Sequence, residues 1–275
     1  MRVRKTHRRD RSEIHALVSR ARHTSPALWN WEAHLTDGGF AVVEEGGRIE
    51  GALLASSDAS PSAWVRLAAV GDTLDVGEWL DGSLPLVLTH LRALGRNELT
   101  WMDHERWAGP FLRPRGFAPL TDVITLTKTD HSMPVTRDPR IRLRPASPAD
   151  FGAICAIDRS AFTPTWWRSE ASVKRRAKTT SRFTVAECRG RVVGYAEREL
   201  HFPTAHLNRL AVHPRDQRQG IGALLLKRAL VLLWEKGVDA VSLNTQQSNH
   251  QSRRLYDRFG FRPTGDSATV WVMRL

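Results

Sequence analysis

The chain repeats itself after about 143 residues. Residues 40–51 (FAVVEEGGRIEG) match residues 183–194 (FTVAECRGRVVG), with a Phe, a Gly-Arg pair and a Gly in register. Two further matches lie at offsets of 143 and 144: residues 67–68 (LA) with 210–211, and residues 116–117 (GF) with 260–261. A repeat of this length predicts two copies of one domain rather than a solenoid of short units.

Each copy shows the same predicted order of strand, helix, strand, hairpin strand, strand, helix, strand, helix, strand. Turn residues at 45–48 and 189–191 mark the two hairpins. This mixed order predicts an α/β (α+β) fold, with helices on the faces of a central sheet. The expected domains are residues 1–130 and 139–275, joined by a short polar linker that contains Pro134.

The second copy contains a strand, a loop and a helix over residues 206–236. The strand has apolar residues at Leu207, Leu210 and Val212, and Pro214 ends it. The helix, residues 221–236, is apolar on nearly every side, so we expect it to be buried. Gly237 then suits the C-cap of this helix.

The loop before this helix, residues 217–222 (QRQGIG), places Gly220 and Gly222 at the helix start. Glycine there lets a ligand approach the first helical N–H groups, which have no partner inside the helix. These groups, the helix dipole and the charge of Arg218 predict a site for a pyrophosphate. The alternative is that the two glycines only permit a tight turn between strand and helix.

A second motif lies downstream of this helix. Residues 240–246 (AVSLNTQ) alternate like a strand, and residues 249–261 (NHQSRRLYDRFGF) predict a loop and a short helix. Together with residues 210–223, this segment resembles the GNAT superfamily of acetyl-CoA-dependent N-acetyltransferases. Residues 139–275 resemble the ribosomal-protein alanine N-acetyltransferases in sequence, and the tandem layout resembles mycothiol synthase.

The resemblance implies two tandem GNAT-like domains, each with a splayed, mainly antiparallel sheet, and acetyl-CoA in the gap beside the fourth strand. It places the backbone of Leu210, Ala211 and Val212 along the pantetheine arm. The other residues that it assigns to the co-substrate are Gln217, Arg218, Gln219, Gly220, Ile221, Gly222, Ala223, Asn249 and Ser252. It implies that Tyr256 protonates the departing thiolate. The alternatives are a buried aromatic role for Tyr256 and a loop-capping role for Asn249.

The general base departs from the pattern of the resembled family. Relatives of the alanine-acetylating kind often carry a Glu on the fifth strand, where this chain has Asn244, which cannot take a proton. The candidate substitutes are Glu199, His206 and Glu197, acting directly or through water. The alternative for each is a solvated charge at a strand edge.

The first copy lacks the glycine loop. Residues 71–80 (GDTLDVGEWL) place three acids where phosphates would bind, and like charges repel such a ligand. The counterpart of Tyr256 falls near Leu112, which has no hydroxyl. We therefore expect the first copy to be a degenerate domain that does not bind acetyl-CoA.

Tryptophan is concentrated in the first copy, with six of the ten in the chain: Trp29, Trp31, Trp64, Trp79, Trp101 and Trp107. Such large rings supply burial in cores and interfaces. The alternative is that Trp29 and Trp31 form part of an acceptor pocket. In the second copy, Trp166 and Trp167 suit either a lid over the acceptor site or core packing.

The net charge of +12 arises in the second copy, where residues 139–275 contain 24 Lys and Arg against 11 Asp and Glu. Part of this excess suits the phosphates of acetyl-CoA. Part lies in residues 174–178 (KRRAK), which suit a solvated helix face or a rim that attracts an acidic partner. Cys155 and Cys188 have no metal-ligand spacing and suit core positions. The chain shows no membrane span and no export signal, so we expect a cytoplasmic protein without a membrane partner.

Together these features predict an acyltransferase that moves an acetyl group from acetyl-CoA to a primary amine, using the C-terminal domain. The acceptor is a small molecule or a protein or peptide N-terminus, and the sequence specifies neither which of these nor the oligomeric state. The alternative is a basic acetyl-CoA-binding regulatory or nucleic-acid-binding module without turnover. Tyr256 and Asn249 favour the enzyme, so a nucleic acid is not the expected partner.

Overall fold

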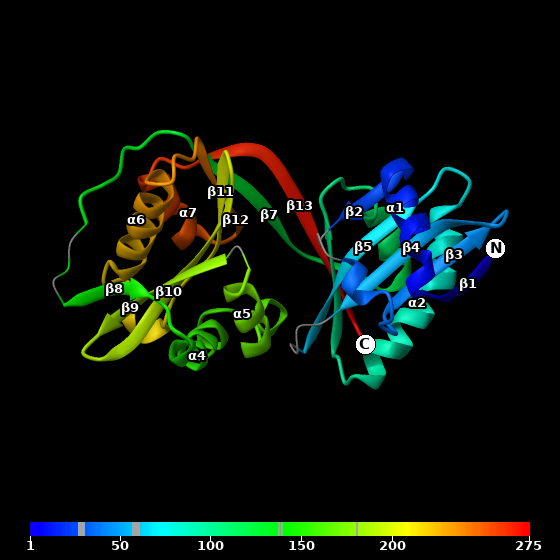
Figure 1. Ribbon diagram of the computed structural model, residues 1–275, viewed down its shortest axis with the longest axis horizontal. Coiled ribbons are helices and arrows are strands. Elements are labelled where there is room, and N and C mark those ends of the chain that lie inside the picture. The colour runs from blue at the N-terminus through cyan, green and yellow to red at the C-terminus, as the bar shows by residue number, and fades with distance from the viewer. Residues whose placement is uncertain (27–30, 57–60, 137, 139, 180) are drawn as a thin grey trace. The chain divides into compact units, whose positions relative to one another are not determined.

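A computed structural model describes residues 1–26, 31–56, 61–136, 138, 140–179 and 181–275 (Figure 1). The chain divides into two compact units. Unit 1 consists of Met1–Thr121 and Ala268–Leu275, and unit 2 consists of Asp122–Ser267. These units differ from the expected boundaries, 1–130 and 139–275, because each includes a strand from the other half of the sequence.

Unit 1 contains a mixed, mostly antiparallel sheet with the strand order β1-β3-β4-β5-β6-β13, and β2 pairs with β5. Its strands are β1 (Arg2–Lys5), β2 (His23–Pro26), β3 (Phe40–Glu45), β4 (Arg48–Ser56), β5 (Ser62–Val70), β6 (Glu98–Asp103) and the end of β13 (Arg262–Arg274). Its helices are α1 (Arg11–Arg20), α2 (Val76–Ala93) and α3 (Gly109–Leu112).

In unit 2 the strand order is β7-β12-β11-β10-β9-β8. Its strands are the end of β7 (Ala118–Lys128), β8 (Ile141–Pro145), β9 (Ser181–Cys188), β10 (Arg191–His201), β11 (Thr204–Val212) and β12 (Ala240–Gln246). Its helices are α4 (Phe151–Ala161), α5 (Glu170–Ala177), α6 (Ile221–Trp234) and α7 (His250–Arg258). The predicted fold class, two units with a mixed sheet flanked by helices, is confirmed. None of the helices in these stretches is long and apolar enough to cross a membrane.

The strands β7 and β13 are exchanged between the two copies. Residues 123–128 of β7 pair antiparallel with β12, in unit 2. Residues 269–274 of β13 pair antiparallel with β6, in unit 1. Because β7 and β13 occupy matching places in the repeat, each copy supplies the strand that completes the sheet of the other.

An ion-pair cluster repeats in both units and confirms the internal repeat. The Arg4 guanidinium donates to the two Asp10 oxygens at 2.6 and 2.9 Å and to Glu44 at 2.7 Å. Its counterpart, Arg144, donates to Asp150 at 2.7 and 2.8 Å and to Glu187 at 2.9 Å, and it lowers the pKa of the Asp150 carboxyl. This cluster ties the first helix of each unit to its sheet.

Matching β-bulges define the register of the repeat. The extra residue between β4 and β5 is Arg66, and the extra residue between β10 and β11 is Asn208. Leu54 pairs with Leu67 in unit 1, and Glu197 pairs with Arg209 in unit 2. The structure therefore aligns Leu67 with Arg209, one residue from the match with Leu210 that the sequence suggests.

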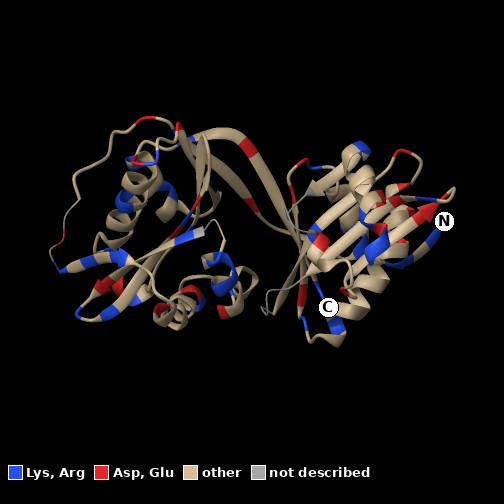
Figure 2. Ribbon diagram, viewed as in Figure 1, with Lys and Arg blue, Asp and Glu red and all other residues tan. Residues whose placement is uncertain are grey.

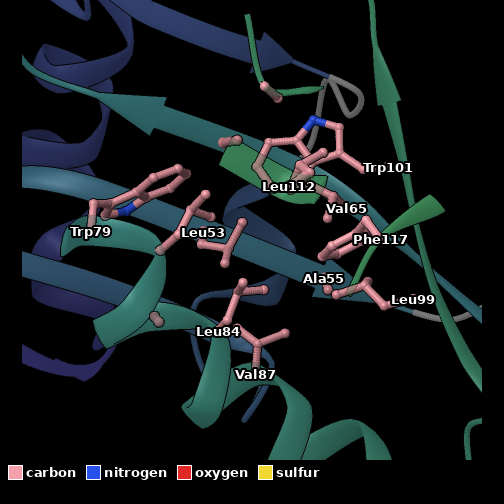
Figure 3. Close-up of a cluster of buried hydrophobic side chains, with 14 of the residues drawn as sticks. Leu53, Ala55, Val65, Trp79, Leu84, Val87, Leu99, Trp101, Leu112 and Phe117 are labelled. Atoms are coloured by element: carbon pink, nitrogen blue, oxygen red, sulfur yellow. The ribbon is translucent and has the colours of Figure 1, made fainter. Parts of the chain in front are cut away.

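The core of unit 1 lies between the sheet and α2 (Figure 3). Trp79 of α2 and Trp101 of β6 are fully buried there, with ring centroids 6.3 Å apart in an edge-to-face arrangement. Trp31 is buried in a separate cluster with Ile14 and Phe40. The packing interpretation of these tryptophans is confirmed, whereas Trp29 lies outside the described residues.

The core of unit 2 includes one face of α6, whereas the sequence predicts burial on nearly every side. Leu224, Val231 and Leu232 are only half-buried and Arg228 is exposed. The helix ends at Trp234, two residues before the predicted end, and Gly237 follows with a φ of +74°. Helices α4 and α5 contribute to a separate cluster, which contains Ile154, Val173 and Tyr195. Cys155 is buried in that cluster and Cys188 is half-buried.

Candidate active site

A gap opens between β11 and β12 of unit 2. These parallel strands pair only from Thr204 with Ala240 to Leu207 with Leu243. Beyond that point β11 continues to Val212 while its other edge stays paired with β10. Residues 208–212 therefore present one edge that pairs with no strand in the described part of the chain.

Backbone groups of Leu210 and Val212 face this open edge. The His213 N–H donates to the Val193 carbonyl on β10 at 2.9 Å, and the Val212 carbonyl accepts from the Gln217 side chain at 3.0 Å. Peptide groups alternate between the two edges of a strand, so Leu210 and Val212 face the gap while the Ala211 peptide faces β10. The open edge is thus a row of backbone donors and acceptors.

The start of α6 follows this edge after residues 213–220. Arg218 and Gly220 adopt left-handed conformations, with φ of +61° and +82°, and Gly220 is the N-cap. No side chain caps the helix, and its first backbone bond runs from Leu224 N–H to the Gly220 carbonyl at 3.1 Å. The N–H groups of residues 221–223 consequently have no partner within the helix. Arg218 and Gln219 are exposed beside them.

The end of β11, the start of α6 and α7 meet at Gly222. A Cβ atom at Gly222 would lie 3.5 Å from Leu255 of α7 and 3.9 Å from Val212 of β11. Asn249 begins α7, where its Oδ1 accepts the Ser252 N–H at 3.1 Å. Asn249 therefore caps the helix, as the loop-capping alternative predicts. Its Nδ2 has no hydrogen bond to any residue that the structure describes.

Tyr256 of α7 is only 7% exposed, and its ring packs against Phe261 at a centroid distance of 5.9 Å. Burial raises the pKa of the Tyr256 hydroxyl to about 12, so this hydroxyl keeps its proton at neutral pH. Among the residues that the structure describes, the hydroxyl has no hydrogen-bond partner. Tyr256 thus has the burial that the packing alternative predicts, and its role as the acid stays a prediction.

The three base candidates differ in their surroundings. Glu197 is fully buried and forms ion pairs with Arg168 and Arg176, so its carboxylate is inaccessible. The His206 Nδ1 lies 2.8 Å from the Ser242 hydroxyl, and burial lowers the pKa of His206 to about 4. Glu197 is enclosed and His206 is half-buried, so neither is a fully solvated charge at a strand edge.

Glu199 is more accessible, with 19% of its side chain exposed. Its Oε2 accepts a hydrogen bond from the Asn208 amide at 3.0 Å and lies 3.5 Å from the Arg176 guanidinium. Asn208 is the bulged residue at the point where β11 leaves β12. Glu199 is therefore held at the start of the gap. Asn244, at the position where relatives carry Glu, is exposed and accepts a bond from Thr125 at 3.0 Å.

Figure 2 shows Lys and Arg along α5. The basic run at residues 174–178 is only partly a solvated face. Lys174 is exposed and pairs with Glu170 at 2.7 Å, but Arg176 points to Glu197 and Glu199. The interpretation of the run as a solvated face is therefore wrong for Arg176, because α5 directs this side chain toward strand β10. Trp166 and Trp167 are both half-buried.

Among the described residues of unit 1, no comparable gap opens. Its strand β2 pairs with β5 from His23 with Val70 to Pro26 with Leu67, on the edge that β11 leaves open in unit 2. The matching helix α2 is capped by Asp75, whose carboxylate accepts the Glu78 N–H at 3.0 Å. Leu112, near the counterpart of Tyr256, is fully buried.

Comparison with known proteins identifies the class. The family described as Acetyltransferase (GNAT) family matches residues 151–261. The chain is 28% identical over 134 residues to a putative [ribosomal protein bS18]-alanine N-acetyltransferase of Bacillus subtilis, covering 45% of this chain and 89% of that protein. It is 32% identical over 122 residues to an uncharacterized N-acetyltransferase of Methanocaldococcus jannaschii, covering 44% of this chain and 77% of that protein. It is 28% identical over 193 residues to the mycothiol acetyltransferase of Acidimicrobium ferrooxidans, covering 62% and 61%.

Solved structures match over nearly the whole chain. A GCN5-related N-acetyltransferase from Sphaerobacter thermophilus has a TM-score of 0.68 at 14% identity, covering 99% of this chain and 95% of that one. A tandem GNAT protein from the clavulanic acid biosynthesis pathway has a TM-score of 0.67 at 18% identity, covering 99% and 98%. At these identities the likeness shows the fold.

The fold and the relatives define an acyltransferase. The chain belongs to the GNAT family of N-acetyltransferases, whose members use acetyl-CoA and an amine acceptor.

Proposed function

We propose that unit 2 transfers the acetyl group of acetyl-CoA to a primary amine, on a small molecule or on a protein or peptide N-terminus. One observation supports this most directly: the open edge of β11 leads to the start of α6, which has no side-chain cap. Helix α7, which carries Tyr256, lies beside the end of β11 and the start of α6. Unit 1, where strand β2 covers the matching edge, is then a degenerate copy without a second site.

The residues along the gap fit the chemistry of acetyl-CoA. The peptide groups of Leu210 and Val212 suit the two amides of an extended pantetheine arm, which would pair with β11 as an added strand does. The free N–H groups of residues 221–223, together with Arg218, suit a pyrophosphate. The Asn249 Nδ2 and the Ser252 hydroxyl are further polar groups on the neighbouring helix. When bound, acetyl-CoA supplies an activated acetyl thioester.

Two side chains would move protons during the transfer. Glu199 accepts a proton from the amine nitrogen, directly or through a water molecule, because it is the accessible carboxylate at the start of the gap. Tyr256 donates the proton of its hydroxyl to the departing thiolate sulfur. The backbone N–H groups of β11 hold the thioester carbonyl and polarise it. Correct positioning of the two reactants supplies a large share of the acceleration.

The test is CoA release from acetyl-CoA with a panel of amines and N-terminal peptides. We expect turnover with at least one acceptor, and Glu199→Gln should lower kcat/KM at neutral pH by about a hundredfold to ten-thousandfold. Glu187→Gln, which alters a carboxylate that pairs with Arg144, is the matched control and should retain turnover. Binding of acetyl-CoA without CoA release, together with salt-sensitive affinity for DNA or RNA, would support the regulatory module instead.

A further inference from the structure

A buried charged cluster connects α4, the segment after it and the sheet of unit 2. Asp158 of α4 is fully buried. Its carboxylate accepts the Tyr195 hydroxyl at 2.5 Å, the Arg209 guanidinium at 2.9 and 3.0 Å, and the Arg168 backbone N–H at 2.9 Å. Burial raises the pKa of the Tyr195 hydroxyl, so it remains a donor to Asp158 at neutral pH.

Arg209 extends this cluster to the segment 162–168. Its guanidinium lies 3.6 Å from the centroid of the Phe162 ring and donates to the Trp166 carbonyl at 2.6 Å. The same guanidinium holds Asp158, so one side chain fixes α4 and the segment that follows it. Arg209 also directly precedes Leu210 on β11, whose backbone faces the gap.

A second set of ion pairs leads from this segment to Glu199. The Arg168 side chain pairs with the buried carboxylate of Glu197. Arg176 of α5 pairs with the other oxygen of Glu197 and reaches Glu199 at 3.5 Å. Glu197 and Arg176 thus connect the segment 162–168 to the proposed base Glu199.

Unit 1 has apolar residues at the four positions that match Asp158, Tyr195, Glu197 and Arg209. The shared register of the sheets matches Tyr195 with Ala52, Glu197 with Leu54 and Arg209 with Leu67. The shared Arg–Asp cluster at the start of each first helix matches Asp158 with Val18. Ala52, Leu54 and Leu67 are buried in an apolar cluster, and Val18 packs against it.

This comparison within one chain separates fold from function. Unit 1 forms the same strands and the same first helix around apolar side chains, so the fold itself does not require the charges. Buried ion pairs are often no more stabilising than apolar residues of similar volume, because both charges lose their hydration. The cluster in unit 2 therefore needs another explanation, and its position beside Glu199 supplies one.

We infer that Asp158 and Arg209 are positioning residues for the acceptor. They hold the segment 162–168 against β11, so that this segment and Glu199 form a fixed surface on which the amine is oriented. The inference rests on the proposed function of unit 2. It assigns to the Asp158–Arg209 pair an effect on the acceptor and none on the affinity for acetyl-CoA.

The main experiment replaces the first part of the cluster by apolar residues, using the triple variant Asp158→Val, Tyr195→Phe and Arg209→Leu. No unpaired charge remains at these three positions, but the Arg168 N–H and the Trp166 carbonyl each lose a hydrogen bond. The variant should therefore fold, with a melting temperature lowered by about 5–10 °C. We expect the Kd for acetyl-CoA to stay within about threefold. The kcat/KM for the acceptor should fall about a hundredfold with a raised acceptor KM, since misplacement by about 1 Å has effects of that size. Amide hydrogen exchange in residues 162–168 should become at least about tenfold faster, a readout that does not depend on turnover.

Two further variants complete the test. Asp150→Asn breaks the ion pair that both units share, and it should lower the melting temperature without changing the acceptor KM. Arg209→Lys keeps the charge but loses the planar fork that reaches both Asp158 and Trp166, so the acceptor KM should rise even if the triple variant fails to fold.

Each outcome separates this inference from the proposed function. A triple variant that keeps its acceptor kcat/KM and its hydrogen exchange within threefold of wild type would overturn the positioning role. A large fall in melting temperature with lost acetyl-CoA binding would show a structural role and overturn it as well. Wild-type protein without CoA release for any amine would instead refute the proposed function, whatever the variants do.

Discussion

The matching strand pairs β11–β12 in unit 2 and β5–β6 in unit 1 both separate, but the freed edges have different fates. In unit 2, β11 leaves β12 after Leu207, and its edge remains open to Val212. In unit 1, β5 leaves β6 after Trp64, but β2 pairs with the freed edge as far as Val70. A splayed pair of strands therefore does not by itself form a binding site in this fold.

The helix starts differ in the same way. Asp75 caps α2 through the Glu78 N–H, whereas α6 begins at Gly220 without any side-chain cap. In unit 1, strand β2 forms hydrogen bonds with the backbone edge of β5 that β6 leaves free. The Asp75 carboxylate accepts one of the N–H groups at the start of α2 that have no partner within the helix. In unit 2 the same kinds of groups stay available for a ligand. The difference teaches that the proposed site consists largely of backbone groups that the fold leaves unpaired.

The largest expected effect concerns the open helix start. Gly220→Trp fills the space beside the N–H groups of residues 221–223 and should abolish acetyl-CoA binding in calorimetric titration, where wild type should bind one equivalent. Three charge-assisted hydrogen bonds, at about 1.5 kcal/mol each, correspond to at least a thousandfold in Kd.

The control for this variant is Gly237→Trp. Gly237 has a φ of +74° against +82° for Gly220, and a Cβ at either position meets no atom within 4 Å. Both variants therefore carry the same backbone strain, but only one lies at the helix start. Equal loss of binding in both, or two comparable sites in wild type, would contradict the difference between the units.

The exchanged strands give the next largest effect. Trp271 belongs to the end of β13, in the second half of the sequence, but it is buried in the core of unit 1. Trp271→Ala should lower the free energy of unfolding by about 3–5 kcal/mol. Hydrogen exchange should accelerate in β6, its pairing partner. The exposed Arg274→Ala, on the same strand, is the control and should change stability by less than about 0.5 kcal/mol. Faster exchange in β12 in place of β6 would argue against the strand assignment.

The sequence was sufficient for the fold class because the local signals agree with one another. The alternation at residues 206–213, the glycine loop and the apolar helix up to Trp234 all lie where they were predicted, and the repeat appears as two units. The sequence could not show the exchange of β7 and β13. Two equivalent strands carry the same pattern, so pairing within a copy and pairing between copies look identical in sequence.

The site was predictable where it depends on short motifs. Gly222, Val212 and Leu255 come from three segments that the sequence singled out, and the structure brings them together. The Asp158–Arg209 contact joins residues 51 positions apart on different elements, so no local pattern reveals it. One signal was available: the repeat places a charged residue in one copy opposite an apolar residue in the other.

A pH effect distinguishes His206 from its counterpart in unit 1, Trp64, which does not titrate. Burial lowers the pKa of His206 from its ordinary value of 6.5 to about 4 in the folded chain. As the pH falls from 6.5 to 4, the unfolded chain therefore binds a proton at His206 that the folded chain does not yet bind. The corresponding stability is complete above about pH 6.5 and falls, by about 3 kcal/mol at most, as the pH drops to 4. Urea unfolding of His206→Gln across this range should show a flatter pH dependence than wild type. An unchanged slope for His206→Gln would contradict the prediction.

Tyr256 is the next point of contrast, since unit 1 has only Leu112 near the matching position. Tyr256→Phe removes the hydroxyl and keeps the ring that packs on Phe261. We expect kcat to fall by about a hundredfold or more, with acetyl-CoA affinity and melting temperature close to wild type. A kcat within about threefold of wild type, measured on the same preparation as the melting curve, would remove Tyr256 from the mechanism.

The smallest expected effect tests which feature closes unit 1. Asp75→Ala removes the carboxylate that caps α2, and loss of such a cap lowers the free energy of unfolding by about 1 kcal/mol. Removal of the acid also removes charge that would repel a phosphate, but β2 still pairs with β5 over residues 67–70. Because the backbone edge stays occupied, we expect calorimetric titration of the variant to give one equivalent of acetyl-CoA, as in wild type. Asp72→Ala, an exposed acid of the same loop that caps nothing in the described structure, should leave both stability and stoichiometry unchanged. A second site in Asp75→Ala would show that the acid alone keeps unit 1 closed, and that β2 yields its edge to a ligand.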